Sequence, residues 1–171
     1  MNSADSGDIY NFVKELKRKY KTCNPYEIAE MCGINVFYDN LGNVKGLFTI
    51  DRRNSFIILN ENLSDEMADV VMFHELGHYF LHRKEAALSP FSENSLYNMR
   101  SKFEIEANTF AASYLISDED ITENAELGLT TMETAQVLCV PHDIVLIKIK
   151  DMNSRGYDLS VPYIPGSDML A

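Results

Sequence analysis

The chain has 171 residues, 46% of them hydrophobic and 24% charged, which suits a single globular domain with its own core. The formal net charge of −11 argues against a nucleic-acid-binding protein, because contacts to phosphates require clustered Lys and Arg. No apolar run approaches the roughly 18 residues of a membrane span, and the first residues do not resemble a secretion signal, so we expect a cytoplasmic protein.

Two helices are predicted before residue 34. The first carries an apolar stripe at helical spacing, made of Ile9, Phe12, Val13, Leu16 and Tyr20. The second has Asn24 as its N-cap and ends at Gly33. Because the chain has no Cys-x-x-Cys pair, its three widely spaced cysteines, Cys23, Cys32 and Cys139, are interpreted as reduced core thiols.

From residue 34 the hydrophobic period changes from helical to two, which is typical of strands. Ile34, Val36 and Tyr38 alternate with polar neighbours, and two further strands at 46–50 and 56–60 are separated by turn residues. Residues 34–60 are thus expected to form a small antiparallel sheet of three strands. Such a sheet must cover one face with helices, and its 46–50 edge is a place where a peptide could add as a strand.

The next helix is predicted over residues 64–82, with Ser64 as its N-cap, and contains the sequence His-Glu-x-x-His. On a helix, residues four apart lie about 40° apart around the axis and roughly 6 Å along it. His74 and His78 can therefore converge on one zinc ion, while Glu75 can act as general base on a water bound to it. Gly77 in the interior of this helix has two interpretations. Either it allows another segment to approach the helix closely, or the helix simply tolerates a poor helix former at this position.

A catalytic zinc site needs a third protein ligand. His82 lies about 12 Å from His74 along the axis, too far for all three histidines to bind one ion, so it is interpreted as a helix-end or second-shell residue. On the helix predicted over residues 101–116, Glu104 is the better candidate ligand, and Asn108 on the same face can orient a histidine. Glu106 is the competing ligand, but it is expected to point away from that face.

The remaining chain is predicted to be helical over residues 117–151 and extended over 154–171. Ser117 and Thr130 begin capping-box patterns. The segments around Pro141 have the outline of a helix-turn-helix, yet residues 117–151 contain eight acidic residues against two lysines, so core packing is favoured over DNA binding. We expect residues 1–153 to form one metallopeptidase-like α+β domain, comprising the sheet, the active-site helix of gluzincin type, the third-ligand helix and a helical C-terminal half.

Residues 74–82 followed by 104–112 resemble the ImmA/IrrE family of bacterial and phage metallopeptidases, as do the stretches 24–29 and 58–60. The resemblance covers roughly residues 8–150. It implies a zinc-dependent protease with Glu104 as third ligand, acting on a regulatory protein, usually a helix-turn-helix repressor of a prophage or mobile element. Asn108 stands where related gluzincins often carry Asp.

The predicted function is thus Glu75-assisted attack of zinc-bound water on a peptide carbonyl of such a repressor. No side chain is assigned as an additional oxyanion donor. The alternative is a non-catalytic, zinc-containing anti-repressor that works by binding its partner. Direct binding to nucleic acid is the weaker rival because of the net charge.

Overall fold

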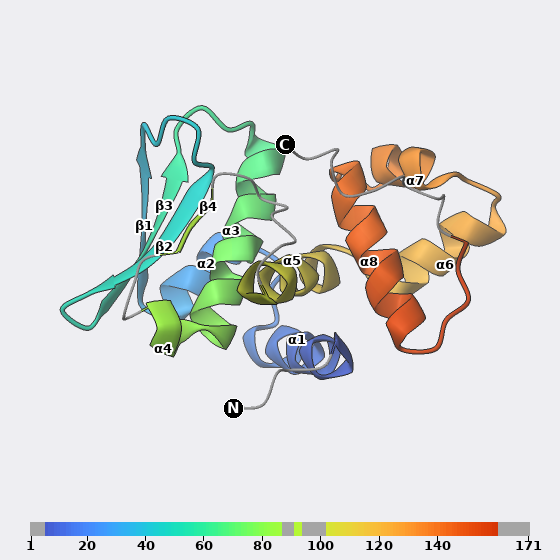
Figure 1. Ribbon diagram of the computed structural model, residues 1–171, viewed down its shortest axis with the longest axis horizontal. Coiled ribbons are helices and arrows are strands. Elements are labelled where there is room, and N and C mark those ends of the chain that lie inside the picture. Colours follow the sequence, from blue (N-terminus) through green and yellow to red (C-terminus); the bar gives the residue numbers. More distant parts are fainter. Residues whose placement is uncertain (1–5, 87–90, 94–101, 161–171) are drawn as a thin grey trace.

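The structure is a computed structural model that describes residues 6–86, 91–93 and 102–160 (Figure 1). The chain has an α+β fold with a helical C-terminal half, as the sequence predicts. The elements of the described residues are α1 (Ser6–Tyr20), α2 (Pro25–Met31), β1 (Ile34–Asp39), β2 (Gly46–Asp51), β3 (Asn54–Asn60), α3 (Asp65–Leu81), α4 (Arg83–Ala86), β4 (Phe91–Glu93), α5 (Lys102–Leu115), α6 (Asp118–Glu126), α7 (Thr131–Val137) and α8 (His142–Ser154).

The predicted helix caps are present. Asn24 accepts hydrogen bonds from the backbone of Tyr26 and Glu27 at the start of α2, and the Ser64 hydroxyl accepts one from Met67 at the start of α3. Ser117 and Thr130 both form complete capping boxes, at α6 and α7. Each cap satisfies backbone N–H groups that have no partner within the helix, so these short polar segments fix where the helices begin.

The sheet is mixed, so the predicted purely antiparallel sheet is wrong in one pairing. Its order is β1-β3-β2-β4, with β2 antiparallel to β3 and β4, but with β1 parallel to β3. The connection from β1 to β2 does not close a hairpin, because it passes the end of β3. The Asn60 side chain holds it there, donating to the carbonyl oxygens of Gly42 at 3.0 Å and Val44 at 2.8 Å.

The short strand β4 adds to the edge of β2 that was expected to be open. Its residues lie opposite Gly46, Leu47 and Phe48. It belongs to the stretch 83–100 between the two helices that carry the potential ligands, in which α4 is a further short helix. The other parts of this stretch, at 87–90 and 94–100, lie outside the described residues.

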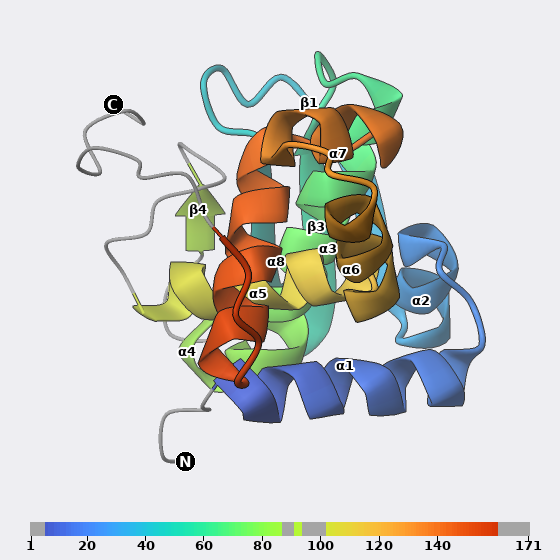
Figure 2. The same cartoon turned by 90° about the vertical axis from the view of Figure 1, so that its right-hand side faces the viewer.

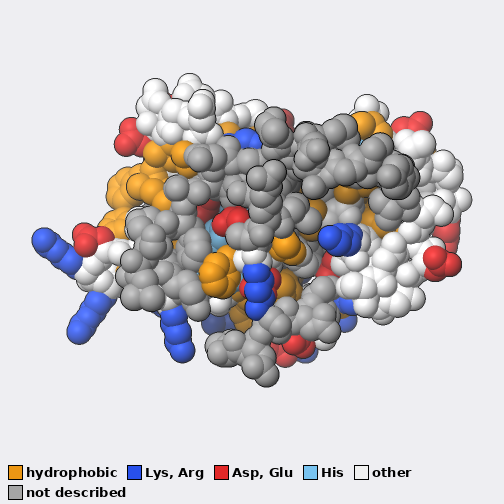
Figure 3. All heavy atoms as spheres, viewed as in Figure 1, with side chains coloured by type: hydrophobic (Ala, Val, Ile, Leu, Met, Phe, Trp, Pro, Cys, Tyr) orange, Lys and Arg blue, Asp and Glu red, His pale blue; other side chains and the backbone are white. Residues whose placement is uncertain are grey.

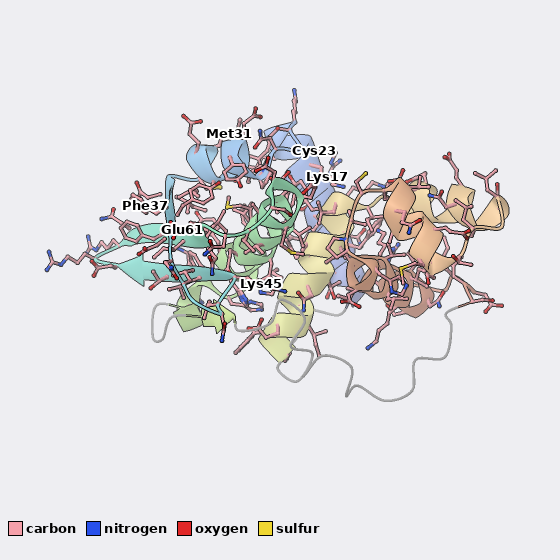
Figure 4. All side chains as sticks on the ribbon, turned by 90° about the horizontal axis from the view of Figure 1, so that it is seen from above. Lys17, Cys23, Met31, Phe37, Lys45 and Glu61 are labelled. Atoms are coloured by element: carbon pink, nitrogen blue, oxygen red, sulfur yellow. The ribbon has the colours of Figure 1, made fainter. Side chains whose placement is uncertain are left out.

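Helix α3 lies between the sheet and α5 (Figure 1). Its residues from Val70 to His78 are all buried, which is the pattern of a helix covered on every side. One face of the sheet supplies Phe48, Ile57 and Leu59 to the core, and the opposite face carries the exposed Phe37, stacked on Phe56 (Figure 4). The sheet therefore covers α3 with one face only.

Of the C-terminal helices, α8 packs onto α5, and α7 packs onto α8. Helix α1 runs along one end of the molecule, beneath α5 and α8 (Figures 1 and 2). In the predicted helix-turn-helix segment, Ala135, Ile144 and Val145 are buried. These helices thus contribute to the core, as expected. The boundary of a single domain at residue 153 stays a prediction, and residues 161–171 of the expected tail lie outside the described part.

The cysteines differ from the expectation in one respect. All three are free, but Cys23 and Cys139 are exposed rather than in the core, because each lies in a connection between helices (Figure 4 labels Cys23). Among the described helices, none is long and apolar enough to cross a membrane.

Candidate metal centre

Three potential metal ligands converge between α3 and α5. His74 and His78 extend from α3 and Glu104 from the first turn of α5. The two histidine Nε2 atoms are 3.1 Å apart, and the Glu104 carboxylate oxygens lie 3.3 Å from Nε2 of His74 and 3.6 Å from Nε2 of His78. Both histidines are almost completely buried, and the side chain of Glu104 retains 11% exposure.

These separations fit a tetrahedral zinc ion. Bonds of about 2.0–2.2 Å at tetrahedral angles place neighbouring ligand atoms about 3.3–3.6 Å apart, close to the three spacings observed. Among the described residues, this is the group of His, Cys, Asp and Glu side chains that could hold a metal ion. Two imidazoles and one carboxylate are also the donor set of many catalytic zinc sites, which leave a fourth position open.

A buried amide orients the first histidine. Nδ1 of His74 lies 2.8 Å from Oδ1 of Asn108, which is on the same α5 face as Glu104. Because the amide oxygen can only accept, this contact places the His74 proton on Nδ1 and leaves Nε2 free for a metal. Asn108 therefore occupies the position expected for it.

The second histidine is backed by His82 and Glu106. Nδ1 of His78 lies 3.1 Å from Nδ1 of His82, and Nε2 of His82 lies 2.8 Å from a carboxylate oxygen of Glu106. Glu106, the competing candidate, is not in the group of three potential ligands, and its carboxylate meets His82 instead. His82 is the C-cap of α3, with φ −126° and ψ 22°, so its ring departs from the helical direction and meets Glu106.

Glu75 is buried next to the start of β2. Its side chain is only 1% exposed, and a Cβ atom added at Gly46 would lie 2.8 Å from the Glu75 Oε1 atom and in collision with Val71. Glycine at position 46 thus leaves the space that the carboxylate occupies. Sequence reasoning noted Gly46 only as part of a strand, because the close approach arises from packing between β2 and α3.

The burial of the site also affects protonation. Burial lowers the pKa of His78 to about 4, although the carboxylate of Glu104 opposes this effect. His78 is therefore neutral near pH 7, which is the form that binds metals. The Glu104 side chain keeps 11% exposure, so the burial is not complete. In the space-filling view, histidine and acidic side-chain atoms show near the centre of one face (Figure 3).

Gly77 of α3 faces Ala107 of α5. A Cβ atom there would lie 3.0 Å from the Ala107 Cα atom and 3.2 Å from the Ala107 carbonyl oxygen. Of the two interpretations of this residue, the structure supports close approach, and the neighbouring segment is helix α5. This approach brings Glu104 to the two histidines.

Comparison with known proteins agrees with the geometry. The profile of an M78 peptidase family, described as the IrrE N-terminal-like domain, matches residues 29–150. The "Uncharacterized immunity region protein 2" of Bacillus phage phi105 is 38% identical over 138 residues, covering 80% of this chain and 85% of that protein. The "Metallopeptidase ImmA" of Bacillus subtilis (strain 168) is 29% identical over 154 residues, covering 87% and 88%. With a matching profile over most of its length, the chain belongs to the ImmA/IrrE family of M78 peptidases.

Proposed function

We propose that this protein is a zinc-dependent endopeptidase whose substrate is a regulatory protein, namely a helix-turn-helix repressor of a prophage or mobile element. The observation that carries the proposal is the convergence of His74, His78 and Glu104 at spacings that suit tetrahedral zinc, with Glu75 buried beside them. Membership in a peptidase family supports the same chemistry.

The chemistry divides between the metal and the chain. When bound, zinc supplies a Lewis acid and lowers the pKa of a coordinated water to about 7. Glu75, one residue from His74 on α3, accepts the proton of the attacking water and returns it to the leaving amine. Asn108 holds the proton of His74 on Nδ1, and the low pKa of His78 keeps that ring neutral.

The substrate assignment draws on the relatives. One is named for a phage immunity region and another as a metallopeptidase, which together favour a regulatory target in a phage or mobile element. The net charge of −11 suits a protein that acts on a repressor rather than on the repressor's DNA site.

The test is co-expression with the helix-turn-helix repressor encoded nearest to this chain, using the native sequence and Glu75→Gln. We expect a discrete repressor fragment, measured by mass spectrometry, with the native protein only. Glu75→Gln should retain zinc, because Glu75 is not one of the three ligands. An intact repressor with both proteins, despite a zinc-loaded native chain and a bound complex, would favour the anti-repressor alternative.

A further inference from the structure

The side of the metal centre behind His78 contains a second buried carboxylate. His82 is 2% exposed and Glu106 is 9% exposed, and the two side chains meet at 2.8 Å. The ring of Phe103 packs on His82 with centroids 4.7 Å apart, which restricts its rotation. Hydrogen bonds thus run from Glu106 to His82 and on to His78.

This chain of contacts admits one proton arrangement when a metal is bound. Nε2 of His78 faces His74 and Glu104, so it must be unprotonated to act as a ligand. The His78 proton therefore lies on Nδ1 and is donated to Nδ1 of His82. His82 in turn carries its own proton on Nε2 and donates it to the carboxylate.

We propose that Glu106 is a positioning residue that keeps His78 in its metal-binding tautomer by acting through His82. The proposal rests on the metal site of the proposed function. Without an acceptor at position 106, His82 can carry its proton on Nδ1 instead. That N–H would then face the N–H of His78 and favour the tautomer of His78 in which Nε2, the ligand atom, is protonated.

The effect of Glu106 on the His78 tautomer comes from its carboxylate oxygen as a hydrogen-bond acceptor rather than from its ion pair with Lys102. Lys102 lies 3.6 Å from the other carboxylate oxygen of Glu106, but its side chain is 54% exposed, and such pairs contribute little. Glu106→Gln retains an oxygen that can accept from His82, whereas Glu106→Leu has none. These two variants, with Lys102→Gln as control, separate the role of the acceptor from that of charge and size.

The first measurement is zinc affinity by competition with a chelator. We expect Glu106→Leu to bind zinc about 10–100-fold more weakly, and Glu106→Gln to lose at most about 5-fold. Lys102→Gln should remain within about twofold of the native chain. Unfolding of each metal-free variant shows that the comparison is made between folded proteins.

The second measurement is the tautomer state of the histidines, from nitrogen-15 chemical shifts recorded at saturating zinc. In the native chain, His82 should carry its proton on Nε2, and in Glu106→Leu a population with the proton on Nδ1 should appear. Unchanged zinc affinity in folded Glu106→Leu, or unchanged tautomers, would overturn the proposal. If the native chain itself bound no zinc, the proposed function would fail instead, so the two failures are distinguishable.

Discussion

At the scale of single residues, the position of the Glu75 carboxylate depends on the absence of a Cβ atom at Gly46. Gly46→Ala would place a methyl group in collision with Val71 and 2.8 Å from Glu75 Oε1, so the side chains of α3 at this point must shift, the buried carboxylate among them. A displacement of about 1 Å in a reacting group costs on the order of 100-fold in rate, so we expect such a loss of cleavage. The measurement is the initial rate of repressor cleavage at saturating zinc.

Zinc affinity is the control for this prediction. The nearest atoms that an added Cβ at Gly46 would meet belong to Val71 and Glu75, and none of them to the ligands His74, His78 and Glu104. Gly46→Ala should therefore bind zinc as tightly as the native chain does. Native-like cleavage by Gly46→Ala would show that Glu75 has room to adjust, and would contradict the role given to this glycine.

The convergence of side chains that depends on local spacing could be predicted from the sequence. His74, Glu75 and His78 follow from positions on one helix, and Glu104 follows from a second helix with the same logic. Glu106 could not be predicted in this way, because the C-cap conformation of His82 moves its ring off the helical path. Contacts made by the end of a helix are set by tertiary packing, which a helical wheel does not describe.

At the scale of elements, the crossing of α3 and α5 determines whether the site forms. Gly77→Ala should lower the free energy of unfolding by about 1–3 kcal/mol through overpacking against the Ala107 backbone, offset by up to about 1 kcal/mol of helix propensity. Because α5 also carries Glu104, zinc affinity should fall as well. Denaturant unfolding with a chelator and zinc titration measure the two effects separately.

A second change tests whether the close approach is the cause. Ala107→Gly combined with Gly77→Ala removes the neighbouring methyl group at 3.3 Å but leaves the Ala107 Cα atom and carbonyl oxygen in place. We expect partial recovery of zinc affinity only. Gly77→Ala with native stability and native zinc affinity would indicate that the residue is simply tolerated.

The sheet shows the limit of sequence reasoning about elements. The strands themselves, and the hairpin from β2 to β3, follow from period-two patterns around a turn at Arg52 and Arg53. The parallel pairing of β1 with β3 does not, because the residues between β1 and β2 also look like a hairpin turn. In the folded chain, the side chain of Asn60 binds that connection from a strand that comes later in the chain, a contact that the local pattern does not contain.

At the scale of the whole molecule, a buried ionic cluster joins the N-terminal helix to the C-terminal helices. Asp118 at the start of α6 binds Lys148 of α8 at 2.6 Å and Arg155, just after α8, through two hydrogen bonds of 2.7 and 2.8 Å. The Arg155 guanidinium also lies 3.8 Å from the centre of the Tyr10 ring on α1. These elements are far apart in sequence, so this cluster links the two ends of the described chain.

The cluster predicts how stability depends on pH. Despite the opposing effect of burial, the hydrogen bonds from Arg155 and Lys148 hold the pKa of Asp118 well below its usual range. A carboxylate with a lowered folded-state pKa contributes stability that is complete above its unfolded pKa of about 4 and declines as the pH falls below it. Asp118→Asn should therefore lower the free energy of unfolding by about 3 kcal/mol at pH 7, because it leaves Lys148 buried without its partner.

The difference between the native chain and Asp118→Asn should then shrink between pH 4 and pH 2, since acid protonates Asp118 in the unfolded chain first and so removes the native chain's advantage. Urea unfolding of both proteins across this range measures it, with the exposed neighbour Glu119→Gln as a control that should change stability by less than about 0.5 kcal/mol. A difference that stayed constant from pH 7 to pH 2 would mean that charge on Asp118 does not hold the cluster together, and that the substitution acts through packing alone.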